Sequence, residues 1–199
     1  MAYRDFTFPE VLRDLGLRLH DADLFTTLPA VPVRPEIEAF VREGINLALA
    51  IGTEKAKSEF IIAPVLLELR HTVGTSLSVF SGVEWNVDPA RGLNGYCDFI
   101  LIRGKSQFVM GAPYVPVVEA KNDNLRTGFG QCIAAMCAAR IANERDATGV
   151  TTVHGVVSTG SAWKFLRLRA DDLTMDIPEY PVENLGKIMG ILRTIVGAG

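Results

Sequence analysis

Residues 115–121, Val-Pro-Val-Val-Glu-Ala-Lys, end a short apolar run with an acid and a base two positions apart. Successive side chains of a β-strand point to opposite faces, so the odd-numbered residues, ending in Glu119 and Lys121, are expected on one face and the even-numbered ones on the other. An unpaired buried charge is costly, so two charges at the end of such a strand need a partner or a metal. An ion pair where the strand reaches solvent is the simplest explanation, and the surrounding sequence is needed to decide whether it is sufficient.

The composition sets limits on the class of protein. With 199 residues, of which 48% are hydrophobic and 22% charged, the chain suits one globular domain covering residues 1–199. The net charge of -3 gives no overall basic surface, so any contact with nucleic acid must be local or supported by a metal or a partner. The three cysteines have no CxxC spacing, which argues against a disulfide framework or a zinc finger. Neither a signal sequence nor a membrane span is evident, so we expect a soluble, cytoplasmic protein without a membrane partner.

The N-terminal third is expected to be mainly helical. A short helix over residues 8–16 precedes an irregular, proline-containing connection over 17–34. Proline at the start and acids in the first turn predict a helix over 35–52, and these N-terminal helices, within 8–52, are interpreted as accessory elements. A second helix is expected over 55–71, with a kink at Pro64 or a break near residue 60. It carries Glu59 on a mainly apolar surface, with Glu68 as a weaker candidate for a site residue.

The middle of the chain changes to strand periodicity. Residues 76–87 alternate as a strand, and residues 96–102 are apolar on both parities, which predicts a central strand in which Asp98 is the only charge. A short strand or bulge is expected at 108–110, before the opening run. A buried helix should follow near 127–145, with Gln131 in its first part.

The last third is expected to complete the sheet. Residues 151–157 form a strand after the buried helix, and a strand, helix, strand order predicts a parallel crossover to the strand of Glu119. Residues 163–168 should pair with 151–157 as a hairpin, and a helix over 183–196 closes the chain. The fold class expected is therefore α/β, with a central mixed sheet flanked by helices and with the hairpin and helix of 163–197 as accessories.

The order of these elements resembles the PD-(D/E)xK nuclease superfamily, which has the restriction-endonuclease-like fold. The resemblance covers roughly residues 55–160: a helix with Glu59, a strand, a strand with Asp98, a strand with Glu119-Ala120-Lys121, a helix with Gln131, and a strand. The chain departs from the family pattern before the first acid, where Cys97 replaces the proline. The resemblance implies hydrolysis of phosphodiester bonds in nucleic acid, DNA being the first expectation, by a metal-dependent nuclease.

The resemblance also implies roles for particular residues. Asp98, Glu119 and the backbone carbonyl of Ala120 would hold Mg²⁺ or Mn²⁺, because hard cations prefer oxygen ligands. Glu59 would hold a metal-bound water or a second metal. Lys121 would orient or deprotonate the attacking water, and Gln131 would help to fix the site or approach the nucleic acid.

Other readings remain open at this point. The alternative to a nuclease is a non-catalytic module with a degenerate nuclease fold that binds nucleic acid or protein, and a third is a small-molecule hydrolase of another α/β type. A homo-oligomer or a partner protein is compatible with each. The three histidines have no metal-ligand spacing, and there is no P-loop, GxGxxG or GxSxG motif. A local basic edge that contacts phosphate is still compatible with the sequence. The residues that could line it are Arg103, Lys105, Arg126, Lys164, Arg167 and Arg169.

Overall fold

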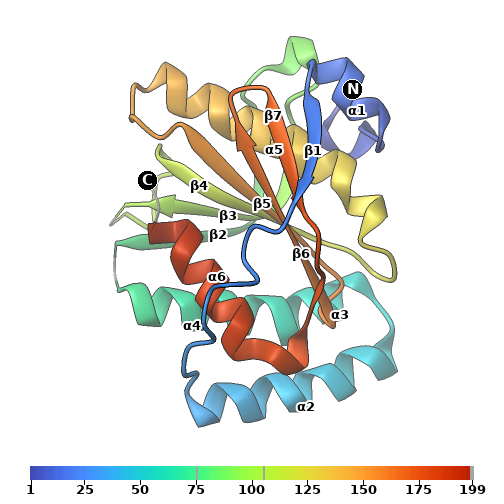
Figure 1. Ribbon diagram of the computed structural model, residues 1–199, viewed down its shortest axis with the longest axis vertical. Helices are drawn as coiled ribbons and strands as arrows, with labels where there is room; N and C mark the ends of the chain where they lie inside the picture. The colour runs from blue at the N-terminus through green and yellow to red at the C-terminus, as the bar shows by residue number, and fades with distance from the viewer. Residues whose placement is uncertain (75, 105, 198–199) are drawn as a thin grey trace.

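The computed structural model describes residues 1–74, 76–104 and 106–197. Within these residues one mixed sheet of eight strands runs in the order β1-β7-β6-β5-β4-β3-β2, with β8 beside β6 (Figure 1). The strands are β1 (Arg18–Ala22), β2 (Leu77–Glu84), β3 (Tyr96–Arg103), β4 (Tyr114–Ala120), β5 (Thr152–Ser158), β6 (Ala162–Arg169), β7 (Asp172–Asp176) and β8 (Tyr180–Pro181). The predicted α/β class with a mixed sheet flanked by helices is confirmed.

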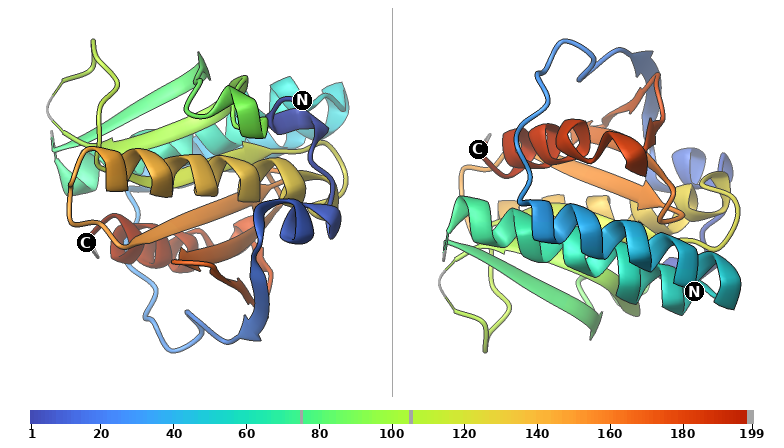
Figure 2. Two further views of the ribbon diagram at one scale, coloured as in Figure 1. Left: turned by 90° about the horizontal axis from the view of Figure 1, so that it is seen from above. Right: turned by 90° about the horizontal axis from the view of Figure 1, so that it is seen from below.

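Helices cover both faces of the sheet (Figure 2). On one face lie α5 (Arg126–Arg145) and the N-terminal segment with α1 (Glu10–Leu15). On the other face lie α2 (Pro35–Ile51), α4 (Ala63–Val73) and α6 (Leu185–Gly197). The sheet thus separates two hydrophobic cores, and both faces of its central strands are buried.

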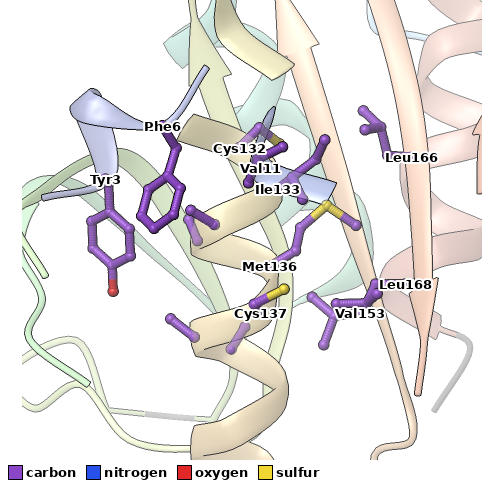
Figure 3. Packing of buried hydrophobic residues seen from close by; sticks show 14 of the residues in the cluster. Tyr3, Phe6, Val11, Cys132, Ile133, Met136, Cys137, Val153, Leu166 and Leu168 are labelled. Atoms are coloured by element: carbon purple, nitrogen blue, oxygen red, sulfur yellow. The ribbon is translucent and has the colours of Figure 1, made fainter. Parts of the chain in front are cut away.

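The core on the α5 face explains why that helix is apolar all round. Figure 3 shows Cys132 and Met136 of α5 among side chains of the N-terminal segment and of the strands, including Val153 and Leu166. Its alanines allow this close approach, because small side chains let the helix lie near the sheet. The cysteines at 97, 132 and 137 are buried and free. Because α5 connects β4 to β5 across this face, the two strands are parallel, as predicted.

The second predicted helix is interrupted as its proline requires. It consists of α3 (Glu54–Lys57), one π-helical turn (Ser58–Ile62) and α4, which has Pro64 in its first turn. Proline has no N–H to donate to the preceding turn, so a regular α-helical ladder cannot continue through it. The widened turn carries Glu59 close to the junction with α3.

Several expectations about the sheet are wrong. The connection over 17–34 contains β1, which pairs in parallel with β7, and neither strand was predicted. Residues 108–110 form no strand or regular bulge, and β8 was also missed. Strict alternation fails at the start of β4: the register shifts opposite Ile100–Ile102, so Val115 packs in the same core as Val118. The β5–β6 hairpin and the closing helix are confirmed.

No helix in the described part of the chain is long and apolar enough to cross a bilayer.

Candidate active site

Two neighbouring strands bring Asp98 to the end of β4. β3 and β4 are antiparallel, and Oδ2 of Asp98 accepts a hydrogen bond from the backbone nitrogen of Ala120 at 2.8 Å. Ala120 stands between Glu119 and Lys121, so this bond holds the acid of β3 beside Glu119 of β4 and beside Lys121, which directly follows that strand. Burial raises the pKa of Asp98, although the bond from Ala120 and the charge of Lys121 partly offset that effect.

Glu119 and Lys121 form a buried ion pair. Oε1 of Glu119 lies 2.6 Å from Nζ of Lys121, and Glu119 is only 1% exposed. Burial, together with the negative charge of Asp98, raises the pKa of Glu119 to about 8. Burial alone would lower the pKa of Lys121, but the charges of Glu119 and Glu54 raise it on balance. The site therefore gathers more negative charge than Lys121 neutralises.

The helical side of the site contains an acid that the sequence did not single out. Glu54 is the first residue of α3, and its Oε2 lies 3.9 Å from Nζ of Lys121. Thr53 caps this helix by accepting a hydrogen bond from Ala56. The sequence prediction started the helix at Lys55 and so omitted Glu54. Recognising Thr53 as the cap would have moved the start by one residue and placed Glu54 in the first turn.

Glu59 lies on the wall of a small pocket beside Asp98. The pocket has a volume of about 260 Å³, and its lining includes Glu54, Glu59, Asp98 and Ala120. Glu59 is exposed and pairs with Lys55 at 2.9 Å, so it faces this pocket without touching the central ion pair. Glu68, the weaker candidate, belongs to a different ion pair. It is 1% exposed and pairs with Arg34 at 2.5 Å.

Gln131 is not joined to the acids. It lies half-buried in α5 and makes no hydrogen bond or ion pair with any described residue. One α5 residue that does meet the site is Gly128, which packs against the side chain of Lys121. The glycines of Gly128-Phe129-Gly130 thus have a packing role, since Gly130 likewise lies against the backbone of Phe6.

The oxygen atoms at the end of β4 are of the kind that a hard cation prefers. Mg²⁺ commonly takes one or two protein carboxylates and keeps several waters, and Asp98 and Glu119 supply two carboxylates beside the backbone of Ala120. Among the described residues, no three or more His, Cys, Asp or Glu side chains form a ready metal cluster. The side-chain ligands that these strands offer to a metal are therefore two carboxylates, those of Asp98 and Glu119.

Comparison with known proteins does not assign the chain to a family. No known protein family matches it, and no curated protein matches its sequence. Function has to be inferred from the chemistry of the site.

A buried lysine holds the loop that leaves the site. Lys57 of α3 is 6% exposed, and its ammonium donates a hydrogen bond to the carbonyl of Asn122, directly after Lys121. Its nitrogen also lies 3.4 Å from Oδ1 of Asp123. Lys57 was missed because nothing in its sequence context distinguishes it from a surface lysine.

A wider cleft of about 900 Å³ opens on the far side of this loop. Arg126 and Lys164 line it, together with four acids, Asp21, Asp123, Asp176 and Glu179. The basic residues considered for one edge do not all meet at this cleft. Arg167 lines a different pocket, Arg103 donates to the carbonyl of Val196, and Lys105 lies outside the described residues.

Proposed function

We propose that this chain is a metal-dependent nuclease that hydrolyses phosphodiester bonds in nucleic acid. The observation that carries the proposal is the hydrogen bond from Ala120 to Asp98, which fixes an acid of β3 beside Glu119 and Lys121 at the end of β4. Two carboxylates and an ammonium at one strand end provide a place for a hard cation next to a group that can act on water.

The electrostatics of the site favour a cation. Glu119 is buried, and its charge is disfavoured by the nearby charges of Asp98 and Glu54. A divalent metal held by Asp98, Glu119 and the carbonyl of Ala120 would offset this repulsion. When bound, such an ion neutralises charge on a phosphate and lowers the pKa of water.

Lys121 is suited to work beside such an ion. Its ammonium is held by Glu119 and lies near Glu54, so the ion pairs fix its position. In the proposed reaction it neutralises charge on the scissile phosphate and orients the attacking water. Gly128 leaves the space that the stem of Lys121 occupies.

The arrangement of elements agrees with the resemblance to PD-(D/E)xK nucleases. The helix with Glu59, β2, β3, β4, α5 and β5 follow in the order that the resemblance names, and β4 and β5 are parallel. An antiparallel pairing here would have removed the analogy.

One observation favours the alternative of a non-catalytic binding module. Lys121 bonds directly to Glu119, so in this arrangement the ammonium itself supplies positive charge to the site. The net charge of -3 also gives little general attraction for phosphate. A module that retained the fold without chemistry would keep this ion pair as a structural element.

The test is cleavage of single- and double-stranded DNA and RNA with Mg²⁺, with Mn²⁺, or with a chelator. We expect metal-dependent cleavage by the parent protein and its loss in Glu119→Gln and Lys121→Ala, with metal binding retained in Lys121→Ala. Glu43→Gln, an exposed change on α2, is the matched control and should cleave normally. Undiminished cleavage by Glu119→Gln would show that the site is wrong, whereas a parent that cleaves none of these substrates would favour the binding module.

A further inference from the structure

A second pocket lies at the opposite end of β5 from the candidate active site. Ser158, the last residue of β5, pairs with Ala120, whereas the pocket begins at Thr152, the first residue of the strand. Its volume is about 460 Å³. It is lined by Phe25, Gly149, Thr151, Thr152, His154, Arg167, Thr194 and Ile195. None of these lining residues is acidic, in contrast to the wide cleft with its four acids.

Two basic side chains share this pocket without a counter-charge. His154 and Arg167 are direct cross-strand partners on β5 and β6, so they lie on the same face of the sheet. Arg167 makes no ion pair with any described residue. His154 is 6% exposed and likewise has no hydrogen-bond partner in the described chain. The ring of His154 lines the pocket, and its nitrogens, which make no hydrogen bond within the described chain, are left for a ligand in that pocket.

The low pKa of His154 is what we expect of this pocket before an anion binds. Burial, and then the charge of Arg167, lower the pKa of His154 to about 4. An anion between the two side chains would offset the charge of Arg167 and favour the protonated ring.

We propose that this pocket binds the phosphate group of a small phosphomonoester. Arg167 offers the forked donors that match phosphate oxygens, and His154 adds a ring N–H. Thr151 and Thr152 contribute hydroxyl groups, whereas the hydroxyl of Thr194 already donates to the carbonyl of Gly190 at 2.9 Å. These side chains together offer more donors than the two oxygens of a carboxylate can accept, so the pocket is better matched to a phosphate.

The size and walls of the pocket point to an ester in preference to the free ion. A volume of about 460 Å³ falls in the range of sites for small organic ligands. Phe25 and Ile195 supply apolar wall, against which the carbon part of an ester would pack. This site is independent of the proposed nuclease centre, so either can fail without the other.

The experiment follows the three histidine ring signals by NMR while inorganic phosphate or glycerol phosphate is added at constant ionic strength. The signal of His154 is identified by its absence in His154→Gln. We expect saturable movement of the His154 signal alone, an upward shift in its pKa, and tighter binding of glycerol phosphate than of phosphate. Arg167→Gln should raise the dissociation constant roughly tenfold or more, since a charged hydrogen-bond donor is lost.

Arg193→Gln is the matched control, because it removes the same charge from α6 outside the pocket lining. It should leave the binding unchanged. No movement of His154, equal movement of all three histidines, or unchanged binding in Arg167→Gln would each overturn the proposal. Equal affinity for the ion and the ester would overturn the assignment to an ester.

Discussion

Gly128, in the first turn of α5, lies directly against the side chain of Lys121. A Cβ atom at position 128 would be 2.8 Å from Cγ of Lys121 and 2.7 Å from Cγ1 of Val157, which is closer than van der Waals contact allows. The absence of a side chain at this position therefore lets Lys121 extend along β4 to reach Glu119. The start of α5 and the end of β4 are fitted to each other at the site.

Gly128→Ala should consequently disturb Lys121. We expect overpacking to cost about 1–3 kcal/mol, partly offset by the better helix propensity of alanine, which is worth about 1 kcal/mol. The cleavage rate should fall by more than the loss of folded protein alone would cause, because Lys121 must move. The measurements are urea unfolding and the cleavage rate, with Gly111→Ala as the control since a Cβ there meets no atom within 4 Å. Normal cleavage by Gly128→Ala would contradict the placement of Lys121 in the site.

Glu119 should make stability depend on pH. Its pKa is raised from 4.5 to about 8 in the folded protein, so the folded state binds a proton that the unfolded state has lost. The parent therefore has its full stability from this group below pH 4.5. That stability is lost progressively as the pH rises from 4.5 to about 8. Gln cannot titrate, so Glu119→Gln should gain stability relative to the parent across the same window. Urea unfolding of both proteins from pH 4 to 9 checks this, and parallel profiles would refute it.

Lys57→Met should loosen the loop after β4. Methionine keeps the apolar stem, but the carbonyl of Asn122 loses its donor, which costs about 1–3 kcal/mol for a buried group. We expect reduced cleavage with unchanged metal binding, because Lys57 positions the loop through Asn122 and Asp123 and pairs with neither Asp98 nor Glu119. Lys55→Met is the control: among the described residues this exposed lysine pairs with Glu59 alone, and its loss should change stability by less than about 1 kcal/mol. Equal behaviour of the two variants would exclude a positioning role for Lys57.

Asn143 should be important for stability without affecting chemistry. This buried residue of α5 accepts from the backbone nitrogen of Tyr114 and donates to its carbonyl, each at 2.8 Å. Asn143→Ala leaves both groups of the first residue of β4 unpaired, so we expect a loss of about 2 kcal/mol or more. Thermal unfolding measures it, with the exposed Asn184→Ala as the control. A change no larger than that of Asn184→Ala would show that water replaces the side chain.

The sequence predicts the central elements because their signals are local. Periodicity gives the helix over 35–51 and the strand with Asp98, and the length of α5 requires a parallel return to β5. β1 has no such signal: it is charged and largely exposed, and its pairing with β7 joins segments about 150 residues apart in sequence. An edge strand of this kind depends on its partner, so β1 cannot be recognised from its own residues.

The site was predictable to the extent that it depends on strand parity. Glu119 and Lys121 follow from the spacing, and Asp98 from its position as the one charge in an apolar strand. The bond from Ala120 to Asp98 depends on the register of β3 and β4, which includes an irregularity that the sequence does not reveal. Glu54 and Lys57 reach the site through the fold of α3, so they could be found only in three dimensions.

The position of a bound Mn²⁺ ion, determined by anomalous scattering from crystals of the parent protein grown with Mn²⁺, tests the central claim most directly. We expect a peak that contacts the carboxylates of Asp98 and Glu119 and the carbonyl of Ala120, and we expect this peak to be absent in Glu119→Gln. No peak at the end of β4, or a peak held by other residues, would contradict the assignment of this site to metal-dependent hydrolysis.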